Sequence, residues 1–156
     1  MAVAAGCHRF AFAVRDMFKF PGFHFSNVDM HVSFPGGVRV DVNHSEHMIR
    51  TDQPRSSGGK GEYPAPMSLF LASIAACTGL YVLRFCQERG VGTDGLKLDL
   101  SSHFNRDEGV VDEVEISITL PVGFPDKYRK AIVLAAKQCT VKKTIQYRPK
   151  FTVQAK

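Results

Sequence analysis

A long apolar stretch over residues 64–89 constrains the fold of this chain more than any other feature. Pro64 and Pro66 suit a helix entry, because the first turn of a helix lacks partners for its N–H groups, and Gly90 suits the exit. Large apolar side chains alternate there with Ala, Ser and Gly, so we predict a helix over residues 66–89 that is packed on most sides. Polar residues, Arg84 among them, interrupt the apolar run well short of the ~20 residues that a membrane span needs. We therefore expect a central core helix and no transmembrane segment.

Strand patterns lie on both sides of this helix. Apolar and polar residues alternate over residues 28–34 and 38–42 around a Pro-Gly-Gly turn, and a third strand is expected over residues 47–51. After the helix, alternation returns over residues 96–100 and 110–120, which predicts a second hairpin.

The remaining segments complete the fold prediction. A Gly- and Ser-rich loop over residues 52–62 leads to the long helix, and a second helix opens at Pro125. A short helical turn is expected within residues 139–145, followed by a final strand over residues 147–153. The order β-β-β-α-β-β-α-β predicts an α+β fold, with residues 1–25 as an N-terminal arm and residues 26–156 as a single domain.

Composition narrows the class of protein. The chain has 156 residues, of which 44% are hydrophobic and 22% charged, a balance typical of globular domains. Its formal net charge of +5 is scattered along the chain, which argues against nucleic-acid binding. The first 20 residues carry charges and end without a small-residue cleavage site, so we expect no secretory signal and a cytoplasmic location.

Cysteine usage points to thiol redox chemistry. In a cytosolic chain, Cys7, Cys77, Cys86 and Cys139 should be reduced, and a pair of them is more readily catalytic or redox-sensing than structural. The competing interpretation is that buried cysteines act as small hydrophobes, which suits Cys86 and Cys7. His44 and His47 lack cysteine or carboxylate partners at zinc spacing, so no metal site is predicted.

Two segments together resemble the OsmC/Ohr family, the osmotically inducible and organic hydroperoxide resistance proteins. Gly58-Gly59 followed by PAPMSLFLASIAACT over residues 64–78 resembles the loop and helix of that family, and CTVKKTI over residues 139–145 resembles its second cysteine segment. The resemblance implies an intertwined homodimer with long helices between sheets and with its sites at the subunit interface.

The resemblance also implies roles for individual residues. Cys77 would be the peroxidatic thiol that attacks an organic hydroperoxide, and Cys139 the resolving thiol; an external dithiol would reduce the resulting disulfide, without any metal, flavin or nucleotide. An arginine would activate Cys77, and Arg39 is the closest match, with Arg50 and Arg55 as alternatives.

One departure from the family pattern bears on activity. Active hydroperoxide reductases of the family carry a glutamate ten residues before the first cysteine, whereas this chain has Met67 there; Glu46 or Glu62 could substitute. A second departure is Thr140, where proline is common. The alternative function is therefore a non-catalytic OsmC-like dimer that binds a hydrophobic ligand or senses redox state.

Overall fold

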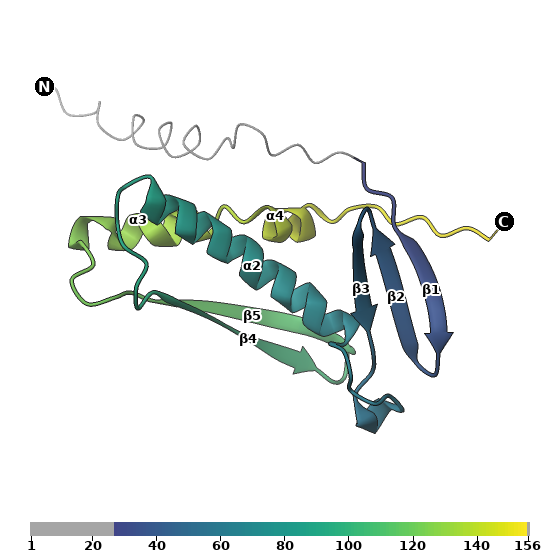
Figure 1. The fold of residues 1–156 in the computed structure, drawn as a ribbon. Coiled ribbons are helices and arrows are strands. Elements are labelled where there is room, and N and C mark those ends of the chain that lie inside the picture. Colours follow the sequence, from purple (N-terminus) through teal and green to yellow (C-terminus); the bar gives the residue numbers. More distant parts are fainter. Residues whose placement is uncertain (1–26, 156) are drawn as a thin grey trace, which may run out of the picture. The chain divides into compact units, whose positions relative to one another are not determined.

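The computed structural model describes residues 27–155, which form two compact units that divide between Arg50 and Thr51 (Figure 1). The expected N-terminal arm, residues 1–25, and Cys7 lie outside the described residues. Each unit is described by itself below.

The first unit is an antiparallel sheet in the order β1-β2-β3. Its strands are β1 (His31–Gly36), β2 (Arg39–His44) and β3 (His47–Thr51). Val32 lies opposite Val42 and Ser33 opposite Asp41, so apolar and polar pairs alternate between the two faces as the sequence pattern predicts. The hairpin turn depends on glycine, because Gly37 has a φ of 61° that residues with a side chain rarely adopt. The early hairpin and the third strand are confirmed.

The second unit is built around α2 (Pro66–Gln87), the long helix that the sequence predicts. Proline occupies the first turn, and Gly90 follows the end of the helix with a φ of 60°. The buried face carries six residues at helical spacing, Ile74, Thr78, Tyr81, Val82, Phe85 and Cys86.

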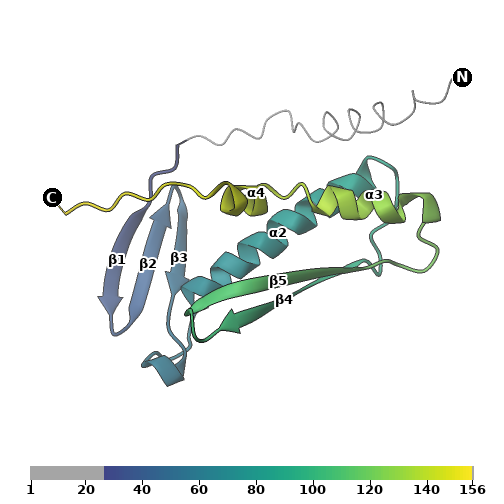
Figure 2. The ribbon, with the colours of Figure 1, turned by 180° about the vertical axis from the view of Figure 1, so that it is seen from behind.

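Three further elements pack around this helix. The hairpin of β4 (Lys97–Asn105) and β5 (Val110–Thr119) runs along one side of α2, while α3 (Asp126–Ala136) and α4 (Thr140–Tyr147) lie along the other (Figures 1 and 2). Ile132 of α3 is fully buried, and the rings of Phe85 and Tyr128 meet edge to face at 5.8 Å between their centroids. The core of this unit is therefore the α2–α3 contact.

The α+β class is confirmed, with one difference at the C-terminus. The final strand expected over residues 147–153 is absent: Tyr147 ends α4, and residues 148–155 are exposed and without regular secondary structure. A strand persists by pairing its backbone groups with a neighbour, and within the described residues this segment pairs with none. Pro149 also lacks the N–H that such pairing needs.

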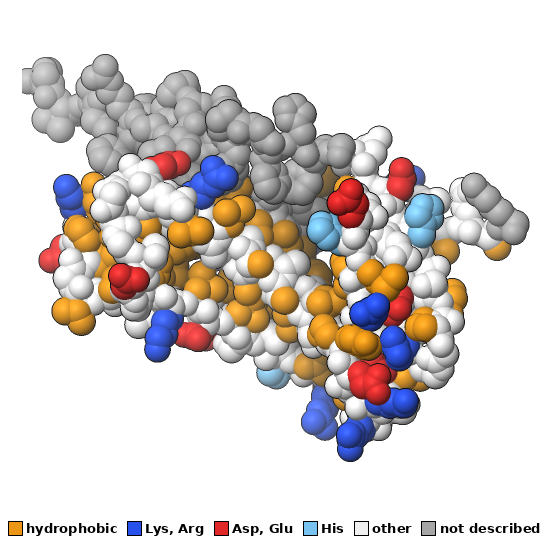
Figure 3. Space-filling view, in the orientation of Figure 1, with side chains coloured by type: hydrophobic (Ala, Val, Ile, Leu, Met, Phe, Trp, Pro, Cys, Tyr) orange, Lys and Arg blue, Asp and Glu red, His pale blue; other side chains and the backbone are white. Residues whose placement is uncertain are grey.

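Helix α2 is long and apolar enough to cross a membrane when length and composition are the only criteria. Its most apolar window has a mean hydropathy of 1.8, and a third of that window is buried. Core helices meet the same criteria, and the packing of α3, α4 and the β4–β5 hairpin against α2 identifies it as one. Its uncovered residues form part of a broad hydrophobic surface over α2 (Figure 3).

Candidate functional site

The structure brings the thiols of Cys77 and Cys139 together. Cys77 lies half-buried in the middle of α2, and Cys139 directly precedes α4 with no part of it exposed. The two thiols lie close enough for each to affect the ionisation of the other. Both are free thiols, so two cysteines from remote parts of the chain form a reduced pair.

Hydrogen bonds between α2 and the start of α4 hold this pair in place. The carbonyl of Ile74 accepts the Thr78 hydroxyl at 2.7 Å and the Cys139 thiol at 3.9 Å. One turn further along α2, the hydroxyls of Tyr81 and Thr140 lie 2.8 Å apart. Thr140, the departure from the usual proline, therefore supplies a contact that proline could not make.

The two thiols have different acidities. Burial raises the pKa of Cys77, and hydrogen bonds from the backbone N–H groups of Val141 and Thr140 offset this only in part. Burial also opposes ionisation of Cys139, but the N–H of Lys142, the Cys77 thiol and the Thr78 hydroxyl hold its pKa below the ordinary value.

The surroundings of Cys139 therefore favour its ionisation relative to an ordinary thiol. Its thiolate would sit at the start of α4, where free N–H groups favour an anion. Cys77, the proposed attacking thiol, is not activated by its neighbours within residues 51–155.

The arginines considered as activators occupy three different elements. Arg39 lies half-buried on β2 and Arg50 on β3, both in the first unit. Arg55 lies in the short 3-10 helix η1 (Arg55–Ser57), and its side chain donates to the carbonyl of Lys60 at 3.4 Å. The role of Arg39 stays a prediction.

Met67 occupies the position of the family glutamate, and its side chain has no carboxylate. Met67 lies in the first turn of α2 with 48% of its surface exposed. Glu62, one of the suggested substitutes, lies 3.8 Å from the ammonium of Lys60. The other, Glu46, is exposed in the turn between β2 and β3.

Asp52 is a structural residue that sequence reasoning missed. Its side chain is fully buried and accepts backbone N–H groups from Gln53 at 2.8 Å, Lys60 at 3.0 Å and Glu62 at 3.1 Å. Burial opposes ionisation, but these bonds hold the pKa of Asp52 below its ordinary value. Residue 59 in the same loop must be glycine, because a Cβ on Gly59 would overlap the carbonyl of Gln53. An aspartate at the start of a Gly- and Ser-rich loop is the signal that could have revealed this role.

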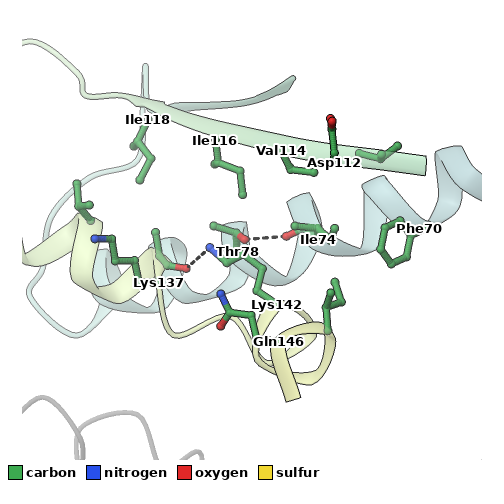
Figure 4. Close-up of a pocket in the computed structure, with 14 residues that line it drawn as sticks. Phe70, Ile74, Thr78, Asp112, Val114, Ile116, Ile118, Lys137, Lys142 and Gln146 are labelled. Carbon is green, nitrogen blue, oxygen red and sulfur yellow. Dashed lines mark hydrogen bonds between the residues drawn. The ribbon is translucent and has the colours of Figure 1, made fainter. Parts of the chain in front are cut away.

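A cavity of about 590 Å³ lies beside the thiol pair. Its walls come from α2, β5, α3 and α4, and neither Cys77 nor Cys139 lines it (Figure 4). Phe70 and Ile74 of α2 line this cavity. Tyr81 of the same helix is buried and contacts Thr140.

Metal-binding side chains are not gathered at this site or at any other within residues 27–155. No three His, Cys, Asp or Glu side chains in that range are placed to hold one ion, and His44 and His47 form no such group.

The fold and the site define an α+β protein with a reduced thiol pair held between two helices. The OsmC family model, described as OsmC-like protein, matches residues 59–154. That range contains both cysteine segments and most of the chain, and the protein belongs to the OsmC family. A search of the curated proteins found no match.

Solved structures of similar fold come from several bacteria. A protein from Psychrobacter arcticus, described as an osmotic stress induced and detoxification response protein, is 26% identical, with 78% of this chain and 90% of that chain covered and a TM-score of 0.66. An OsmC-like protein from Mycoplasma pneumoniae is 14% identical, with coverage of 79% and 89% and a TM-score of 0.64.

A third similar structure carries the name of the peroxide-resistance branch. An organic hydroperoxide resistance protein from Elizabethkingia anophelis is 17% identical, with coverage of 81% and 92% and a TM-score of 0.57. The likeness to this protein and to the one from Mycoplasma supports the fold alone. The family is one often associated with hydroperoxide resistance.

Proposed function

We propose that this protein is a thiol peroxidase that reduces organic hydroperoxides through Cys77 and Cys139. The observation that carries the proposal is the proximity of the two thiols, which affect each other's ionisation and are therefore placed to form a disulfide. Cys77 is the half-exposed member and can meet a substrate, whereas Cys139 is fully buried and suits the resolving role.

The reaction balances with these two thiols and an external dithiol. The Cys77 thiolate attacks the terminal oxygen of the hydroperoxide, the O–O bond breaks, and the departing alkoxide takes a proton to become an alcohol. The resulting sulfenic acid condenses with Cys139, forming a disulfide and releasing water. Two thiol–disulfide exchanges with the external dithiol return both cysteines to the reduced form.

Activation of Cys77 needs a positive charge, because its own surroundings raise its pKa. We assign this role to Arg39, as the family resemblance implies, and expect it to favour the thiolate by direct charge attraction. Reduced thiols at rest also suit a cytoplasmic location.

A homodimer is part of the proposal. Helix α2 leaves Ala72, Ser73, Ala76 and Leu83 exposed, and large hydrophobic side chains of β1 are exposed as well, among them Val32 and Phe34. A second copy of the chain could cover these surfaces. Analytical ultracentrifugation tests this part: a monomer at micromolar concentration would contradict it.

Turnover with defined peroxides tests the enzymatic proposal. We expect reduction of cumene hydroperoxide in the presence of dithiothreitol to be faster than reduction of hydrogen peroxide. Cys77→Ser should abolish turnover, and Cys86→Ser, which changes a buried thiol outside the pair, is the matched control. In Cys139→Ser, a sulfenic acid on Cys77 should accumulate and be trapped by dimedone. If Cys77→Ser and Cys139→Ser both kept the activity of the wild type, the proposal would be refuted.

The raised pKa of Cys77 favours a second candidate function, a non-catalytic dimer that binds a hydrophobic ligand or senses redox state. The pH dependence of Cys77 alkylation separates the two candidates. A peroxidase requires half-maximal reactivity well below the ~8.5 of an ordinary thiol. Half-maximal reactivity above that value would favour the second function.

A further inference from the structure

The cavity between α2, β5, α3 and α4 has no part in the proposed reaction, since neither thiol lines it. Its size and lining are those of a binding site for a small molecule. At about 590 Å³ it falls within the ~300–1,000 Å³ typical of small-molecule sites. All of its walls belong to the unit of residues 51–155.

Most of the cavity wall is apolar, and part of it follows β5. Val114, Ile116 and Ile118 follow one another along β5 and face Ile74 and Thr78 of α2 (Figure 4). Alternation along the strand places all three on the same face. A slot of this kind fits an unbranched hydrocarbon chain better than a compact polar molecule.

The two ends of the slot differ in charge. Lys137, at the end of α3, lies near Ile118, whereas Asp112 lies at the opposite end beyond Val114 (Figure 4). The β4–β5 ladder is irregular beside His103, which leaves Asp112 as an extra residue on β5. An anion would be attracted to the lysine end.

Most polar groups of the lining already have partners. The Asp112 carboxylate accepts from Asn105 at 3.1 Å and lies 2.8 Å from the imidazole of His103. The ammonium of Lys142 donates to the carbonyl of Ala136 at 3.1 Å.

Two polar lining residues differ in this respect. Within residues 27–155, the side chains of Lys137 and Gln146 make no hydrogen bond or ion pair. Lys137 is therefore the cationic group that a ligand can engage without breaking an existing contact.

We propose that this cavity binds an unbranched monocarboxylate, with its hydrocarbon chain along β5 and its carboxylate at Lys137. A carboxylate–ammonium contact at the mouth would fix the direction of the chain, and burial of the methylenes would supply most of the affinity. Neither thiol lines the site, so its occupancy does not require peroxidase activity.

Calorimetric titration of the full chain tests this site with three probes below their micellar concentrations. Dodecanoate should bind one molecule per chain. Dodecyltrimethylammonium, with the same chain and the opposite charge, should bind at least tenfold more weakly, and acetate should not bind. The same results are expected with Cys77→Ser, so failure of the peroxidase proposal would leave them unchanged.

Variants locate the ligand. Lys137→Gln should weaken dodecanoate binding about tenfold, as loss of a charged hydrogen bond of ~1.4 kcal/mol requires. Lys130→Gln removes an exposed lysine of α3 that does not line the cavity and should change binding less than twofold. Val114→Trp should fill the slot and abolish binding while circular dichroism remains that of the folded protein.

Three outcomes would overturn the proposal. Equal binding of the anionic and cationic probes, or equal effects of the two lysine variants, would exclude Lys137 as the carboxylate partner. Absence of dodecanoate binding to the folded wild type would exclude the site itself. If Val114→Trp dissociated the homodimer, the cavity would be a surface that a second copy of the chain covers.

Discussion

The hydroxyl contact between Tyr81 and Thr140 is expected to keep α4, and with it Cys139, closed against α2. The two oxygens lie 2.8 Å apart, and Tyr81 is buried. A hydrogen bond of this kind contributes about 0.5–1.5 kcal/mol net. Because Cys139 is fully buried, reagents reach it only when α4 opens. Loss of ~1 kcal/mol from the closed state should therefore raise the open population about fivefold.

Modification of Cys139 measures this opening. In a Cys77→Ser background, which prevents disulfide formation, Tyr81→Phe should make Cys139 react about fivefold faster with a thiol reagent, as followed by mass spectrometry. Tyr147→Phe removes an exposed hydroxyl from the end of α4 and should leave the rate unchanged.

A double-mutant cycle with Thr140→Val isolates the contact between the two hydroxyls. Urea unfolding at one fixed protein concentration should give a coupling energy of about 1 kcal/mol. If the effects of Tyr81→Phe and Thr140→Val add to within ~0.3 kcal/mol, the two hydroxyls do not stabilise each other and the reasoning is refuted.

Three further predictions concern the loop before α2 and the β4–β5 hairpin. Gly59→Ala should lower the free energy of unfolding by about 1–3 kcal/mol through overpacking, whereas Gly92→Ala, with open space around it, should change it little; equal effects would contradict this steric argument. Asp52 has a lowered folded pKa, so its contribution to stability is present above its unfolded pKa and lost as pH falls through the folded one. Asp52→Asn should thus flatten the acid limb of stability measured by urea unfolding, and an unchanged limb would exclude this role. Hydrogen bonding and charge attraction to Asp112 raise the pKa of His103, so Asp112→Asn should return it toward 6.5 in an NMR titration; an unmoved value would contradict the pairing.

Local patterns predict most of the secondary structure. Period-two alternation identifies β1, β2, β4 and β5, and the apolar run between Pro66 and Gly90 identifies α2 to within two residues of its end. The C-terminal segment could not be predicted in this way, because Tyr147 and the residues after it alternate like a strand but meet no partner strand among the described residues.

The sequence by itself determined the fold class, the family resemblance and the two cysteines worth examining, because these depend on residue type and spacing. Only the tertiary structure decided that Cys77 and Cys139 lie close enough to affect each other's ionisation, that the pKa of Cys77 is raised and that of Cys139 lowered, and that neither thiol lines the apolar cavity. A thiol's acidity depends on burial and on N–H groups supplied by residues far along the chain. Such contacts exist only once α4 has packed against α2, and no local pattern encodes their geometry.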